Sequence, residues 1–128
     1  METRLATASP FTRFHGSRQL LGLLADKWTI PVIHALARGT RRFGELHREV
    51  GGVSQKMLTQ CLRALERHGL VSRTVHPVVP PHVDYALTPL GRSLNEPLAG
   101  LCRWVERYGK ALEREAVEGG EQGVRSKK

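Results

Sequence analysis

Aromatic residues and cysteines are scarce in this 128-residue sequence. Phe, Trp and Tyr make up only 5% of the chain, which argues against a protein that stacks single-stranded nucleic acid on aromatic rings. The two cysteines, Cys61 and Cys102, cannot build a disulfide framework. Because both lie among apolar neighbours, we expect small buried side chains in a reducing compartment.

Long hydrophobic runs are missing as well. The longest one, residues 20–25, is interrupted by Gly22 and is far too short to span a bilayer. Residues 1–4 lead into no hydrophobic signal core. We therefore expect a cytoplasmic protein that has no membrane partner.

Acidic residues are outnumbered by basic ones, with 12 Asp and Glu against 20 Lys and Arg and a net charge of +8. This excess favours an anionic partner, with nucleic acid ahead of an acidic membrane surface. The length suits one domain with a real core. The hydrophobic content of 40% argues against wholesale disorder.

Apolar spacing and capping residues predict the elements of the N-terminal half. Residues 1–16 form an arm without clear periodicity. Ser17 and Asp26 can cap two successive helices, and Gly39 ends the second of them. Pro31 falls near the first turn of that second helix, where its missing N–H costs least.

A helix and a hairpin are predicted next. A short segment at 42–50 and a glycine turn precede a helix over 54–68, which Ser54 caps. Extended segments at 70–75 and 83–87 surround a proline-rich tip, and this pattern predicts a β-hairpin.

A long helix completes the order. It is predicted to begin at Thr88–Pro89 and to reach about Val117, with a kink or split at Pro97. Residues 119–128 are expected to be a flexible tail. The sequence of elements is that of a winged helix-turn-helix domain, a mostly helical α+β fold.

The helix over 54–68 is the strongest candidate for contact with DNA. Its apolar residues fall within an arc of about 100°, and Lys56, Gln60 and Arg63 lie on the opposite side. An ordinary solvated face is the alternative explanation. The residues predicted to read DNA are Ser54, Gln55, Lys56, Thr59, Gln60, Arg63 and Arg67.

Neighbouring basic residues are predicted to hold the DNA backbone, because positioning and base reading are separate tasks. These residues are Arg38, Arg41, Arg42 and Arg73, and the predicted wing residues are His76, Pro80, Pro81 and His82. A basic loop that only keeps the protein in solution is the alternative. On this division of tasks, Arg63→Ala relaxes sequence preference, whereas Arg41→Ala weakens binding to all sequences alike.

Metal and catalytic sites have little support. None of the six histidines forms a His-x-x-x-His pair, and the chain has no Cys-x-x-Cys pair. His76 and His82 flank the predicted hairpin tip, but two ligands make a poor zinc site. The sequence therefore predicts no metal and no cofactor. Because it shows no Ser/His/Asp constellation and no Gly-rich phosphate loop, it also argues against an enzyme.

The chain resembles the HxlR-type winged helix transcriptional regulators, a branch close to the MarR regulators. The resemblance covers roughly residues 15–108. The residues that carry it are Asp26-Lys27-Trp28, 42–46, 53–60, 62–66, 69–71, 79–88 and 91–94. The run Ser-Gln-Lys-Met-Leu-Thr-Gln at 54–60 together with the Pro80-Pro81 tip is a specific pair of motifs.

This resemblance implies a homodimeric regulator that binds double-stranded DNA at a pseudo-palindromic operator. It makes 54–68 the recognition helix and 73–87 the wing, with dimer contacts from the N-terminal helix and the long C-terminal helix. We thus expect an arm at 1–16, a winged helix domain with its dimerisation helix at 17–118, and a tail at 119–128. The expected dimer residues are Leu20, Leu94, Leu98, Leu101, Trp104, Val105, Tyr108 and Leu112.

Two further expectations follow from the resemblance. An unidentified small-molecule effector would sit near Leu24, Trp28, Leu101, Trp104 and Tyr108. An ordinary apolar core made by the same residues is the alternative. His15 occupies the place where thiol-sensing members carry a cysteine, so we expect no oxidant sensing through that position. A winged helix that serves as a protein-interaction or architectural module is the alternative function.

Overall fold

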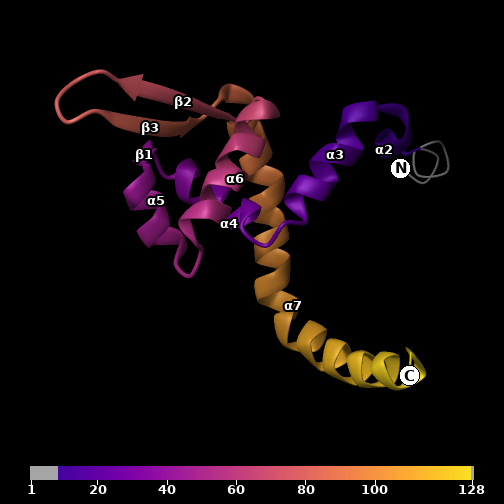
Figure 1. Ribbon diagram of the computed structural model, residues 1–128. Helices are drawn as coiled ribbons and strands as arrows, with labels where there is room; N and C mark the ends of the chain where they lie inside the picture. Colours follow the sequence, from indigo (N-terminus) through magenta and orange to yellow (C-terminus); the bar gives the residue numbers. More distant parts are fainter. Residues whose placement is uncertain (1–8, 128) are drawn as a thin grey trace. The chain divides into compact units, whose positions relative to one another are not determined.

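The computed structural model describes residues 9–127, with side chains up to residue 117 (Figure 1). The elements are α2 (Pro10–Arg13), α3 (His15–Leu24), α4 (Thr29–Ala37), β1 (Arg41–Arg42), α5 (Phe43–Val50), α6 (Gln55–Arg67), β2 (Val71–His76), β3 (His82–Leu87) and α7 (Pro89–Lys127). They form two compact units, one up to Asn95 and one from Glu96 onward. The predicted mostly helical fold with a small hairpin is confirmed.

The core of the first unit is built from apolar faces of α4, α5 and α6 and from the base of the hairpin. Buried side chains are Val32, Ile33, Leu36, Leu46, Leu58, Cys61, Leu62, Leu65, Leu70, Val71 and Leu87. The four of these that come from α6 are the predicted apolar arc of that helix. Its opposite side therefore faces solvent.

A three-stranded antiparallel sheet covers this core in the order β1-β3-β2. The β2–β3 pairs run from Val71↔Leu87 at the base to His76↔His82 at the tip. Figure 1 shows the tip of the hairpin extending beyond α5 and α6, while the base of the hairpin lies next to α6. β1 was not predicted, since its two arginines carry no strand signal and its pairing partners Tyr85 and Asp84 lie over 40 residues away.

The starts of α3 and α4 differ from the prediction. Ser17 lies inside α3, where its Oγ donates to the Phe14 carbonyl at 2.6 Å. Asp26 holds the preceding turn instead of α4, because its Oδ1 accepts the N–H of Trp28 at 2.9 Å. No single helix in the described residues is long and apolar enough to cross a membrane, and α3 with α4 passes that test only as a pair bent by 89°.

The chain ends also differ from expectation. Part of the predicted arm is helical, since Ser9 Oγ accepts the N–H of Phe11 and begins α2. α7 continues past the predicted end near Val117 to Lys127. Each added helical residue gains a backbone hydrogen bond once the helix is nucleated, so its glycines do not stop it. Residues 1–8 of the arm and Lys128 of the tail lie outside the described residues.

A hydrogen-bonded junction joins the end of α6 to the start of α7. The Thr88 hydroxyl donates to the Gly69 carbonyl at 2.6 Å and accepts the Gly91 N–H at 3.1 Å. The Thr88 N–H donates to the Leu70 carbonyl at 3.0 Å. The predicted start of the last helix at Thr88–Pro89 is confirmed, and the same residue fixes the base of the hairpin.

Gly91→Ala is expected to destabilise the first unit by about 1–3 kcal/mol, because overpacking forces backbone shifts. A Cβ at this buried position would collide with the Leu70 carbonyl oxygen, which belongs to the backbone. Gly22→Ala is the matched control, since a Cβ there meets nothing within 4 Å. It should stabilise α3 by about 0.5–1 kcal/mol. Thermal unfolding followed by circular dichroism measures both changes; equal melting temperatures would contradict the collision.

Candidate nucleic-acid interface

The turn between α5 and α6 sets the angle at which α6 leaves the domain. Gly51 and Gly52 adopt φ values of 68° and 77°, a region that glycine enters without steric cost. His47 Nε2 donates to the Val53 carbonyl at 2.8 Å. Ser54 Oγ then accepts the N–H of Met57 at 3.1 Å and caps α6, as predicted. The start of α6 is thus fixed by a hydrogen bond from α5 before it and by its own N-cap.

The predicted DNA-reading residues lie along one side of α6. Ser54, Gln55, Lys56, Gln60, Arg63 and Arg67 are exposed, and Thr59 is half-buried. Within residues 9–117, the three cations of this set make no ion pair. We call these seven residues the α6 polar face. Their donors are free to meet phosphates and base edges.

A groove of about 330 Å³ runs between α6 and the hairpin. It is lined by Thr59, Leu62, Arg63, Glu66, Arg73 and Tyr85. Arg63 and Arg73 therefore approach it from two different elements. Tyr85 and Glu66 are not among the site residues predicted from the sequence, although alternation along β3 puts Tyr85 on the same side as the buried Leu87.

The predicted backbone-contacting arginines are not equivalent. Arg41 Nε donates to Glu49 Oε1 at 2.6 Å, and Arg38 Nη1 lies 3.7 Å from Glu49 Oε2. The Arg41 guanidinium holds the pKa of the Glu49 carboxyl below its usual value. Arg42 is exposed, and its backbone N–H donates to Glu45 Oε1 at 2.8 Å. Arg41 thus braces α5, whereas Arg42 extends from the N-terminal end of that helix.

The predicted wing residues lie around the hairpin tip. His76 and His82 form the last pair of the hairpin, and Pro80 and Pro81 lie exposed between them. Val79 is 99% exposed at the tip, and the predicted wing set did not include it. The proline-rich sequence around Val79 was the available signal, because apolar side chains at such exposed tips can contact the minor groove of DNA.

An apolar stripe runs along α7 in the second unit. It consists of Leu101, Trp104, Val105, Tyr108 and Leu112, which are each 43–49% exposed, and it is called the α7 stripe below. The Trp104 and Tyr108 rings lie 5.3 Å apart. These residues recur at helical spacing on one side of α7. An exposed apolar patch of this kind is typical of a surface that packs against another protein surface.

The other predicted dimer and effector residues are divided between the units. Leu20 and Leu94 line a pocket of about 280 Å³ in the first unit. Leu24 and Trp28 are half-buried in that unit, whereas Leu101, Trp104 and Tyr108 belong to the second. Leu98 is only 8% exposed within the single chain, which leaves it little surface for a dimer contact. The effector pocket and the other dimer contacts stay predictions.

Cys61 is expected to be chemically inert. Burial raises the pKa of its thiol, an effect that the Thr29 hydroxyl at 3.7 Å opposes and nearby Asp26 reinforces. Because the thiolate is the reactive form, Ellman's reagent should modify Cys61 in the folded protein far more slowly than the less buried Cys102. Cys61→Ser and Cys102→Ser variants assign the two rates. Loss of DNA binding after mild peroxide treatment, abolished by Cys61→Ser, would overturn this expectation.

The chain is similar to known proteins in both sequence and fold. Residues 23–113 match the family described as HxlR-like helix-turn-helix. The uncharacterized HTH-type transcriptional regulator YtfH of Escherichia coli K12 is 49% identical over 90 residues, covering 70% of this chain and 71% of that protein.

Two solved structures are also similar. A transcriptional regulator of the MarR family from Enterococcus faecalis V583 is 36% identical with a TM-score of 0.68, covering 84% of this chain and 96% of that one. The redox regulator HypR in its reduced form is 35% identical with a TM-score of 0.71, covering 77% and 97%.

Proposed function

The chain belongs to the HxlR-like helix-turn-helix family, and we propose that it regulates transcription by binding double-stranded DNA as a homodimer. The observation that carries this proposal is the α6 polar face. It stands exposed beside the hairpin, while the apolar face of the same helix is buried in the core. A helix seated in this way can enter a major groove.

Base reading falls to the α6 polar face. Gln60 and Arg63 carry side chains that make two hydrogen bonds to one base, glutamine to adenine and arginine to guanine. Ser54 and Gln55 stand at the N-terminal end of α6, the end that enters the groove in helix-turn-helix proteins.

Backbone binding falls to arginines around α6 and to the wing. Arg42 and Arg38 carry exposed charge before α5, and Arg73 does so across the groove from α6. Arg41 adds charge from a guanidinium that Glu49 holds in place. The exposed tip with Val79 follows the minor groove or the backbone. Because phosphate contacts release counterions, affinity falls steeply with salt concentration.

We assign dimerisation to the α7 stripe, with further contacts from Leu20 and Leu94. A second copy of the chain is the occupant that would give two recognition helices, one for each half of a pseudo-palindromic operator. An effector that binds near Leu24 and Trp28 would act by changing the spacing of those two helices. Because a DNA-binding regulator acts in the compartment that contains the genome, the proposal includes a cytoplasmic location. It assigns no catalytic activity to the chain.

Selection of binding sites from random duplex DNA tests the proposal, followed by a salt titration on the enriched sequence. We expect an inverted repeat, and an affinity that falls linearly on a log–log plot against salt concentration. Salt-sensitive binding without an enriched motif would favour an architectural role. No binding at all would favour a protein-interaction module.

A further inference from the structure

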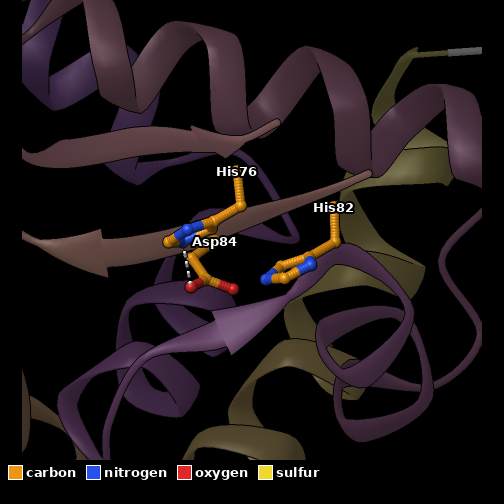
Figure 2. Close-up of side chains that lie close together, drawn as sticks. All are labelled: His76, His82 and Asp84. Carbon is orange, nitrogen blue, oxygen red and sulfur yellow. Dashed lines mark hydrogen bonds and ion pairs between the residues drawn. The ribbon is translucent and has the colours of Figure 1, made fainter. Parts of the chain in front are cut away.

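Three side chains that can bind a metal ion meet at the outer end of the hairpin. His76 and His82 face each other as the last pair of the ladder, and Asp84 lies two residues beyond His82 on β3. Residues two apart on a strand share a face, so the three side chains project to the same side. Figure 2 shows them pointing in one direction.

The distances suit a shared ion. A ligand atom from each of the three residues lies within 4.8 Å of the other two. The His76 Nε2 and Asp84 Oδ2 atoms are 2.8 Å apart. Two metal bonds of about 2.1 Å at tetrahedral or right angles put neighbouring ligand atoms roughly 3.0–3.4 Å apart. Small rotations of the His82 and Asp84 side chains therefore bring all three atoms to bonding distance.

The two imidazole rings are already packed together. Their centroids lie 4.5 Å apart with an angle of 26° between the rings. The His76 side chain is hydrogen-bonded to Asp84, whereas the His82 ring makes no hydrogen bond to the described residues. All three are half-buried, so their side chains lose less freedom on binding an ion than exposed ones would.

The surrounding charges are few. Arg42 on β1 pairs with Asp84 in the sheet, and Thr74 on β2 pairs with it from the other side. Among the described side chains, no ion pair joins Arg42 to Asp84, and the carboxylate of Asp84 pairs with His76. The carboxylate is thus free to offset part of the charge of a dication.

We propose that His76, His82 and Asp84 form a binding site for a divalent first-row transition metal ion. Two imidazoles and one carboxylate on a single face are a donor set that such ions favour, with remaining positions left open. The sequence pattern predicted no metal site, because only two histidines flank the hairpin tip. The β2–β3 register adds Asp84 as the third ligand. A bound ion crosslinks the two strands beside the tip.

Zn²⁺ titration of the purified, tag-free protein by calorimetry tests the site. We expect one ion per chain and a higher melting temperature with Zn²⁺, because a ligand of the folded state stabilises it. His76→Ala, His82→Gln and Asp84→Asn should each lower the Zn²⁺ affinity at least about tenfold, since loss of even an outer-sphere partner costs about 10- to 100-fold.

His34→Ala is the control, because His34 is an exposed histidine of α4 that is not part of the cluster. It should leave Zn²⁺ affinity unchanged. The visible spectrum of bound Co²⁺ gives a second readout, which each ligand variant should alter while circular dichroism stays that of the folded protein. Absence of stoichiometric binding, or an equal loss in His34→Ala, overturns the proposal. No DNA is present, so these results do not depend on the proposed function.

Discussion

Val105→Asp is expected to convert the dimer to a monomer and to lower affinity for the selected operator about 10²- to 10⁴-fold, the usual gain from linking two binding modules. Val105 lies in the middle of the α7 stripe, 44% exposed. In the proposed dimer its substitution would bury an unpaired carboxylate against apolar partners, which is strongly unfavourable. Each monomer would then hold DNA through one half-site only.

Sedimentation equilibrium measures the first effect, and fluorescence anisotropy with labelled operator measures the second. Lys110→Asp is the control, because helical spacing puts Lys110 on the opposite side of α7 from the stripe. It introduces the same side chain and should remain dimeric. A Val105→Asp variant that stays dimeric would show that the α7 stripe is covered by something other than a second copy.

Arg63→Ala is expected to cost about 1–3 kcal/mol on the selected operator, or roughly 5- to 150-fold in affinity. Its effect on random duplex should be far smaller, because Arg63 is proposed to read a base edge from the α6 polar face. Arg103→Ala removes the same charge from an exposed position of α7 and should change neither affinity by more than about twofold.

Arg42→Ala supplies the contrast. As a proposed phosphate contact, it should weaken operator and random duplex alike and reduce the salt slope by about 1. Arg42 is a cleaner test than Arg41, whose removal would also free the Glu49 carboxylate that it holds at 2.6 Å. Equal losses on both DNAs for Arg63→Ala and Arg42→Ala would refute separate roles for base reading and backbone binding.

Local patterns predicted the parts of the fold that local physics decides. The buried face of α6 follows from helical periodicity, and its start follows from the cap at Ser54. Ser17 and Asp26 are equally good caps by residue type, yet their side chains bond to neighbouring turns instead. Capping preference therefore identifies residues that can cap a helix, but it does not predict which backbone groups their side chains will hydrogen-bond.

Long-range pairing decided what the sequence did not reveal. β1 forms because its backbone pairs with the edge of β3. Glu49 accepts a hydrogen bond from Arg41 because α5 lies beside β1. Likewise, Asp84 joins the two histidines through the register of β2 and β3. In each case the pairing joins different elements of the fold. Neighbouring residues therefore give no indication of the pairing, which only the fold determines.

The junction at Thr88 has a consequence for how this protein can change. Because Thr88 bonds to Gly69 and Leu70, the ends of the hairpin are fixed independently of the length of its tip. Each doubling of a loop costs only about 0.6 kcal/mol of closure entropy. Insertions between Pro77 and Pro81 can therefore lengthen the hairpin tip, the proposed wing, while the fold of the domain is preserved.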